Sequence, residues 1–222
     1  MSIVDAPRAD MSATEFRRRA KAAGSVARGT NEFGDHRLNP DLHGLFVNAK
    51  LREAAVLVPV VDRGRDASVI LTQRTEALKA HPGQIAFPGG RVDAEDRDVE
   101  HAAMREAMEE IGLDAGHIEI VGRLPDYVSG SGYRIVPVLS VVRPGFRLTL
   151  NPDEVDSVFE VPLGFLMDPA NHRRQSRTWA DKERFFYEMP FGDRYIWGVT
   201  AGIIRTLYER LYAGPEAARP GA

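Results

Sequence analysis

The chain of 222 residues is long enough for one domain with a well-buried core, because domains usually hold about 100 to 200 residues. Its 29 basic and 32 acidic side chains leave a formal net charge of -3, which excludes a general electrostatic field for nucleic acid or an anionic membrane. The absence of cysteine excludes disulfides, zinc–thiolate sites and thiol nucleophiles, so any metal must bind oxygen or imidazole. The sequence has neither an apolar run of about 18 residues nor an apolar signal core, so we expect a cytoplasmic protein that binds neither membranes nor nucleic acid.

Residues 1–50 are polar and interrupted by glycine and proline, which is typical of an N-terminal extension. One helix is predicted within it, over residues 12–23, because Ser12 can cap the helix and Glu15 follows three residues later. Phe16 is the sizeable apolar residue of this helix. We therefore expect the helix either to pack on the core of its own chain or to pair two chains in a homodimer.

The region that follows, residues 51–212, is predicted to form the main domain from a mixture of strands and helices. Segments rich in valine and isoleucine predict strands, and the first two flank a turn-like segment at 62–66, which indicates a hairpin. The predicted strands cover residues 54–61, 68–72, 118–124, 134–142 and 155–161. Helices are predicted over residues 98–111 and 197–212. Residues 213–222 are rich in alanine, glycine and proline and predict a disordered tail.

The predicted helix over residues 98–111 concentrates acidic residues near its end. At about 100° per residue, Glu106, Glu109 and Glu110 fall on one side of the helix. The other side is expected to pack on the core and carries Met104, Ala107, Met108 and Ile111. Like charges at this spacing oppose the helix by about 0.2–0.5 kcal/mol per pair, whereas a bound Mg²⁺ or Mn²⁺ prefers carboxylate ligands and would reverse that cost. A solvated acidic face is the alternative interpretation.

Glycines on both sides of the helix complete a recognisable pattern. Phe87-Pro88-Gly89-Gly90 lies before the helix, Gly112 ends it, and the segment from Arg105 runs Arg-Glu-Ala-Met-Glu-Glu-Ile-Gly-Leu. This combination resembles the Nudix box, although the spacer from Gly90 to Arg105 is one residue longer than the common pattern and Asp96 replaces a glutamate. The resemblance implies a Nudix-type α/β/α sandwich with a mixed central sheet. It also implies metal-dependent hydrolysis of nucleoside diphosphate linkages.

The same resemblance implies roles for individual residues. The implied ligands of Mg²⁺ or Mn²⁺ are the side chains of Glu106, Glu109 and Glu110, with a backbone carbonyl of Gly90 or Gly89. The implied catalytic residues are Glu109, Glu154 and Arg105. Glu109 either binds the metal or orients water, and Glu154 is a general base, an extra ligand or an exposed loop acid. Arg105 is expected to orient the carboxylates by pairing with an acid such as Asp96, without contacting substrate.

A second resemblance concerns the substrate. Leu71-Thr72-Gln73-Arg74-Thr75, followed by Lys79, Gly83 and Phe87-Pro88-Gly89-Gly90, resembles the signature upstream of the Nudix box in the coenzyme A pyrophosphatase branch. Coenzyme A carries a diphosphate and a ribose 3'-phosphate, so its site needs several cations besides the metal. The expected substrate-binding residues, each with a solvated surface charge as the alternative, are Arg74, Lys79, Arg91 and Arg134.

Two alternatives to coenzyme A hydrolysis remain open. The same chemistry could act on ADP-ribose, NADH or an oxidised nucleotide. The fold could also bind a nucleotide as a regulator without cutting it, although all three helix glutamates are present. Structural roles are expected for His81 as a loop hydrogen-bonding residue, Tyr133 as a loop anchor and Trp197 as a core residue.

Overall fold

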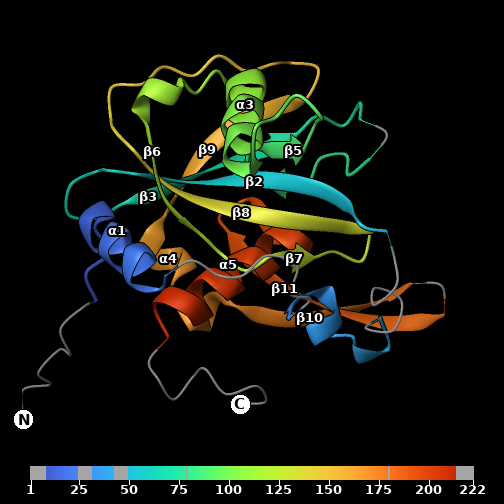
Figure 1. Cartoon of the computed structure of the whole chain (residues 1–222). Helices are drawn as coiled ribbons and strands as arrows, with labels where there is room; N and C mark the ends of the chain where they lie inside the picture. Colours follow the sequence, from blue (N-terminus) through green and yellow to red (C-terminus); the bar gives the residue numbers. More distant parts are fainter. Residues whose placement is uncertain (1–8, 25–31, 43–49, 79, 180, 214–222) are drawn as a thin grey trace, which may run out of the picture.

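The computed structural model of the chain describes residues 9–24, 32–42, 50–78, 80–179 and 181–213. Helices lie on both sides of a central sheet, as Figure 1 shows, so the predicted α/β/α sandwich is confirmed. The predicted tail from residue 214 onward lies outside the described residues.

The central sheet contains nine strands within the described residues. They are β1 (Phe33–Gly34), β2 (Arg52–Val61), β3 (Ser68–Arg74), β4 (Ile85–Ala86), β5 (Gly89–Arg91), β6 (Ile118–Arg123), β7 (Tyr127–Val128), β8 (Tyr133–Val142) and β9 (Val155–Pro162). β2 pairs in parallel with β8 from Arg52 opposite Tyr133 to Val61 opposite Val142. β2 and β3 form the predicted antiparallel hairpin, and β3 continues antiparallel to β9. Because layers cover both faces, these central strands are apolar on both sides.

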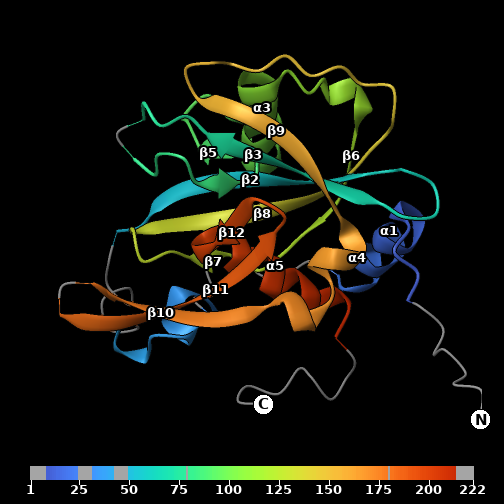
Figure 2. The same cartoon turned by 180° about the vertical axis from the view of Figure 1, so that it is seen from behind.

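The described helices are α1 (Ala13–Ala22), α3 (Val99–Ile111), α4 (Leu163–Leu166) and α5 (Gly198–Leu211), with 3-10 turns η1 (Asp35–Arg37), η2 (Pro40–Leu42), η3 (Ala115–His117) and η4 (Pro169–Asn171). α3 covers one face of the sheet, and α1 and α5 cover the other in both views (Figures 1 and 2). Each face of the sheet has its own apolar core. Successive side chains of β2 point into one core and then the other, with Leu57 on the α3 side and Val58 on the α5 side. None of the helices in the described segments is long and apolar enough to cross a membrane.

Helix α1 packs on the core of its own chain. Ser12 caps the helix by accepting a hydrogen bond from the backbone N–H of Glu15 at 3.2 Å, as the sequence predicts. Phe16 is fully buried in the core that contains α5, and Arg17 pairs with Glu119 of β6 at 2.9 Å. Since Phe16 is used within the chain, it does not provide an apolar anchor between two subunits.

The prediction for the two sides of α3 was partly wrong. Ala107 and Ile111 are buried as expected, but Met108 is 53% exposed and Glu110 is 2% exposed. The helix packs on the sheet through small residues such as Ala103 and Ala107. This close approach turns the side that carries Glu110 toward the body of the protein and leaves Met108 outside.

A second sheet, for which the sequence analysis predicted no element, follows β9. It consists of β10 (Arg173–Trp179), β11 (Lys182–Phe191) and β12 (Arg194–Trp197), paired antiparallel in that order. β10 is exposed along nearly its whole length and carries three arginines, so it lacks the alternation of apolar and polar residues that indicates a strand. The last strand, β12, leads directly into α5.

Candidate active site

Four segments meet at the end of β3. The backbone N–H of Arg74 donates to the carbonyl of Gln84 at 2.9 Å, which closes the loop between β3 and β4. The next N–H, of Thr75, donates to the carbonyl of Glu154 at 3.0 Å. The N–H of Asn151 donates to the carbonyl of Glu110 at 2.9 Å, near the end of α3. Backbone hydrogen bonds therefore hold together β3, the loop between β3 and β4, the end of α3 and the 151–154 turn.

Two glycines bring the β5 backbone against α3. Gly89 has φ 155°, and its N–H donates to Glu110 Oε2 at 3.1 Å. A Cβ on Gly89 would lie 2.4 Å from the carbonyl oxygen of Ala55 in β2. A Cβ on Gly90 would lie 2.5 Å from the carboxylate of Glu106. The fold therefore requires glycine at Gly89, where a side chain would meet the backbone of β2, whereas a side chain at Gly90 would displace the carboxylate of Glu106.

Glu110 is a buried acid, which corrects the sequence-based expectation of a solvent-facing side chain. Its partners are the N–H of Gly89 and the Arg74 guanidinium, whose Nη1 lies 3.5 Å from Oε1. The pKa of Glu110 is raised to about 7, chiefly by burial and also by the nearby acids Glu106 and Glu154, although the Gly89 N–H and Arg74 lower it. Glu110 is thus held beside two other acids, Glu106 and Glu154, where burial disfavours its charged form.

The other two glutamates of α3 differ in exposure. The Glu106 side chain is 15% exposed, and burial raises its pKa, with further contributions from Glu109 and Glu154. The Glu109 side chain is 54% exposed and accepts a hydrogen bond from Arg105 Nη1 at 2.8 Å. Glu109 is therefore the member of the group that is open to solvent.

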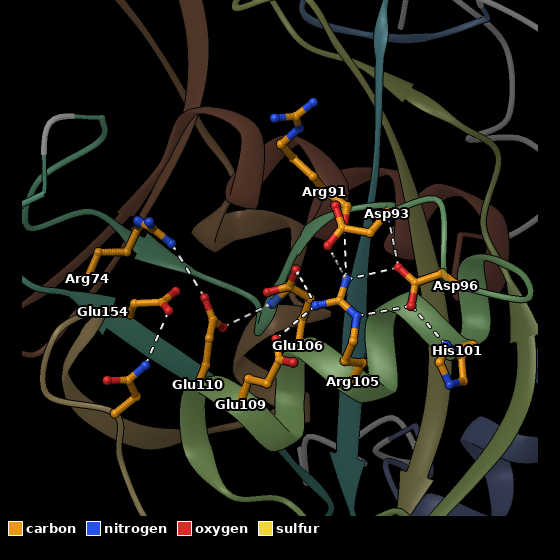
Figure 3. A network of polar contacts seen from close by, with 12 residues as sticks. Arg74, Arg91, Asp93, Asp96, His101, Arg105, Glu106, Glu109, Glu110 and Glu154 are labelled. Atoms are coloured by element: carbon orange, nitrogen blue, oxygen red, sulfur yellow. Dashed lines mark hydrogen bonds and ion pairs between the residues drawn. The ribbon is translucent and has the colours of Figure 1, made fainter.

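Arg105 links most of these acids, and its expected pair with Asp96 is present. Its guanidinium donates to Asp96 through Nε at 3.0 Å and Nη2 at 2.9 Å. The same group donates to Glu106 at 3.1 Å, to Glu109 at 2.8 Å and to the carbonyl of Arg91 at 3.1 Å (Figure 3). Hydrogen bonding to Asp96 raises the pKa of Arg105 and holds the pKa of Asp96 well below its usual range. One fixed cation thus sets the positions of two α3 carboxylates.

The remaining sequence-predicted residues separate into two groups. Glu154 joins the site, because its charge acts on Glu106 and Glu110, and its Oε1 accepts from Asn151 Nδ2 at 3.2 Å. Arg91 is exposed and points away from Glu106 in Figure 3. Among the expected cations within the described residues, Arg74 is therefore the one that lies beside the glutamates.

Arg134, a further predicted cation, does not join this group. Arg134 lies on β8, where its guanidinium pairs with Glu53 at 3.5 Å and with Asp126 at 3.8 Å. Lys79 lies outside the described residues. His81 forms the expected loop hydrogen bond, with Nδ1 3.0 Å from Gln84 Oε1.

The donor set suits a hard divalent cation that is completed by substrate and water. No three acidic or histidine side chains in the described ranges are close enough to make a closed metal site by themselves. Mg²⁺ usually takes one or two carboxylates and keeps water and phosphate oxygens, so an open site is sufficient. The Gly90 cradle for the Glu106 carboxylate and the grouping of Glu106, Glu110 and Glu154 both fit such an ion.

A pocket of about 410 Å³ adjoins the site on the other side of the β3 end. It is lined by Gln73, Glu76, Pro82, Gly83, Gln84, Ile85, Asp193, Arg194, Tyr195 and Trp197. The expectation that Trp197 is a core residue was wrong, because the side chain is half-buried and lines this pocket. The pocket could not be recognised from the sequence, since its two walls are about 110 residues apart in the chain.

Comparison with known proteins places this geometry in a family. The Nudix domain of Shewanella oneidensis NrtR, solved with ADP ribose, superimposes with a TM-score of 0.47 at 16% identity, covering 78% of this chain and 97% of that chain. A Citrobacter koseri protein described as an uncharacterized Nudix hydrolase NudL is 39% identical over 171 residues, covering 77% of this chain and 87% of the relative. A Klebsiella pneumoniae protein of the same description is 37% identical, covering 81% of this chain and 91% of the relative. The family model of the NUDIX domain matches residues 51–182, more than half of the chain. The chain therefore belongs to the Nudix hydrolase family, and its sandwich is the Nudix fold.

Proposed function

We propose that the protein hydrolyses the diphosphate bond of coenzyme A, giving adenosine 3',5'-bisphosphate and 4'-phosphopantetheine. Acyl thioesters of coenzyme A would give the acylated second product. The observation that carries the proposal is the position of Arg74, the cation of the Leu-Thr-Gln-Arg-Thr signature, 3.5 Å from the buried Glu110. A diphosphate that reaches the glutamates therefore also meets this guanidinium.

We further propose that Mg²⁺ or Mn²⁺ serves as the cofactor. The residues that would hold it are Glu106, Glu109, Glu110, the Gly90 carbonyl and, as an additional acid, Glu154. When bound, the cation supplies charge neutralisation on the phosphate oxygens and activation of a water molecule.

The side chains of the site have distinct tasks in this reaction. Arg74 attracts the substrate phosphates and remains close enough to Glu110 to limit the repulsion between that acid and the substrate. Arg105 keeps Glu106 and Glu109 in place through hydrogen bonds and is a positioning residue, because its guanidinium is already engaged by acids. Glu109 and Glu154 are the candidate proton acceptors.

A substrate panel tests the proposal. Purified protein is incubated with coenzyme A, acetyl coenzyme A, ADP-ribose or NADH, with Mg²⁺ or Mn²⁺, and the products are separated by chromatography. We expect cleavage of coenzyme A and its thioester, and loss of at least about 100-fold in kcat for Glu106→Gln. The matched control is Glu100→Gln on the same helix, where Glu100 pairs with Arg123 at 3.2 Å, and we expect it to retain activity.

Each other outcome of the panel has a definite meaning. Cleavage of ADP-ribose or NADH without coenzyme A would reject the proposed substrate while keeping the chemistry. Tight nucleotide binding in calorimetry without cleavage of any compound would indicate a nucleotide-binding regulator.

A further inference from the structure

The pocket beside the β3 end belongs to the same substrate path as the glutamates. Gln73 and Arg74 are consecutive on β3, and consecutive side chains of a strand point to opposite faces. Gln73 lines the pocket, whereas Arg74 reaches Glu110. A ligand whose phosphates lie at Arg74 can therefore pass around the end of β3 and place its next group in the pocket.

The wall of the pocket formed by β12 presents a fixed aromatic surface. Trp197 stacks with Tyr195 at a centroid distance of 6.2 Å and an interplanar angle of 28°. Phe186 of β11 meets Trp197 edge-on at 5.4 Å, and the Arg177 guanidinium lies 5.1 Å from the Trp197 ring centroid. Because neighbours hold the indole in place, it offers a preorganised flat surface for another ring.

The opposite wall offers polar groups that match the edge of a purine. Gln73 and Gln84 contribute carboxamides whose Oε1 atoms contact Arg194 and His81, which leaves their N–H groups to donate to the ring nitrogens of adenine. Glu76 contributes a carboxylate that can accept from an exocyclic amine, and Asp193 adds a second acid at the rim. Two carboxylates make the pocket unfavourable for phosphate groups, so the phosphates of a bound nucleotide remain on the Arg74 side.

Arg194 does not reverse this preference, because it pairs with Asp193 at 3.8 Å and the carboxylate of Glu76 remains in addition. Its guanidinium donates to Gln73 and to Ser157 Oγ and lies 4.6 Å from the ring centroid of Phe159. The phosphopantetheine half of coenzyme A has no planar ring with which to use the Trp197 surface.

We propose that this pocket binds the purine base of the substrate, with the base stacked on Trp197 and its polar edge facing Gln73 and Gln84. The base then lies on one side of the β3 end and the diphosphate on the other. The assignment of the ligand as one half of coenzyme A rests on the proposed function. The preference of the pocket for a purine rests instead on the Trp197 surface and the polar wall opposite it.

The two tryptophans of the chain make the proposal directly measurable. Trp179→Phe leaves Trp197 as the single indole, so its fluorescence reports on the pocket. The probes are adenosine 3',5'-bisphosphate and 4'-phosphopantetheine, titrated separately without metal. We expect saturable quenching by the bisphosphate and none by phosphopantetheine. In the matched control, Trp197→Phe, the remaining Trp179 is 76% exposed and should not respond.

A second measurement gives the size of the effect. Trp197→Ala should raise the Kd for the bisphosphate, measured by calorimetry, by about 10-fold, whereas Trp179→Ala should leave it unchanged. Quenching by phosphopantetheine instead of the bisphosphate, or bisphosphate binding without any change at Trp197, would overturn the proposal. If coenzyme A is not cleaved but adenine nucleotides still quench Trp197, the proposed substrate fails and the purine pocket stands.

Discussion

Replacing Asp96 with asparagine tests whether the Asp96–Arg105 pair anchors the active site. The Asp96 carboxylate, whose side chain is 1% exposed, accepts from Arg105 Nε and Nη2 at 3.0 and 2.9 Å. It also accepts from the backbone N–H of Asp93 at 2.9 Å and from the His101 ring at 2.8 Å. Asparagine has the same shape but only one acceptor oxygen. Its amide NH2 group would therefore face N–H donors that the second carboxylate oxygen of Asp96 now accepts from.

The expected loss in the free energy of unfolding follows from these contacts. Hydrogen bonds to charged groups contribute about 1.5–3 kcal/mol each, and removing one partner of a buried pair costs about 3–5 kcal/mol. Arg105 is 23% exposed and keeps Glu106 and Glu109 as partners, which offsets part of the loss. We expect Asp96→Asn to lower the free energy of unfolding by about 2–3 kcal/mol, which corresponds to about 4–12 °C in Tm.

The assay is urea unfolding followed by circular dichroism, without metal or substrate, so that catalysis plays no part. Asp93→Asn is the matched control, because the Asp93 side chain is 58% exposed and lies 3.7 Å from Arg105. We expect this control to change the free energy of unfolding by less than about 0.5 kcal/mol. Equal losses for the two variants would refute the anchoring role of Asp96.

Two further predictions concern the glycine turn and a buried histidine. Gly90→Ala should leave the free energy of unfolding nearly unchanged but lower kcat by about 100-fold, because the added Cβ displaces the flexible carboxylate of Glu106. Gly89→Ala should instead destabilise the fold, because its Cβ meets the backbone of β2. Burial lowers the pKa of His172, which hydrogen-bonds the carbonyl of Leu166 at 2.7 Å. The unfolded chain therefore takes up this proton first as pH falls, so His172 should lower stability below about pH 6.5 by at most about 1.4 kcal/mol per unit, opposite in sign to the contribution of Glu110, and His172→Gln should remove the His172 contribution from the slope.

Stability curves and steady-state kinetics decide both predictions. Full activity of Gly90→Ala would show that the turn does not control the Glu106 carboxylate. An unchanged pH slope of the unfolding free energy in His172→Gln would show that other groups cause the acid sensitivity.

Local features were predictable from the sequence because they depend on residues close together in the chain. Helix α3 ends at Gly112, which has φ 66°, and begins after Asp98, whose carboxylate accepts from the N–H of His101 at 2.8 Å. The β2–β3 hairpin follows from two apolar segments around a turn. The family was evident for the same reason, since the glycine turn and the α3 glutamates form one short motif.

Other features of the site depend on contacts between distant segments, and these only the tertiary structure decided. Glu110 and Glu109 are adjacent in sequence, yet one is buried against β5 and the other is exposed, because the rotation of α3 is set by how its alanines pack on the sheet. Glu154 was expected to be a general base, an extra ligand or an exposed loop acid, and the fold brings it to Glu106 and Glu110. Asp96 had no assigned importance beyond a possible pairing with Arg105, and it proved to be the anchor of that residue.

The second sheet and its pocket also depend on contacts between distant segments, which the sequence does not reveal. An aromatic residue before an apolar helix has the same local pattern whether it fills a core or lines a cavity, so the sequence could not place Trp197. Its position is fixed by the pairing of β12 with β11 and by the approach of β12 to β4. The sequence therefore determined which chemical groups the protein has, and long-range packing determined which of them are buried, paired or presented to a ligand.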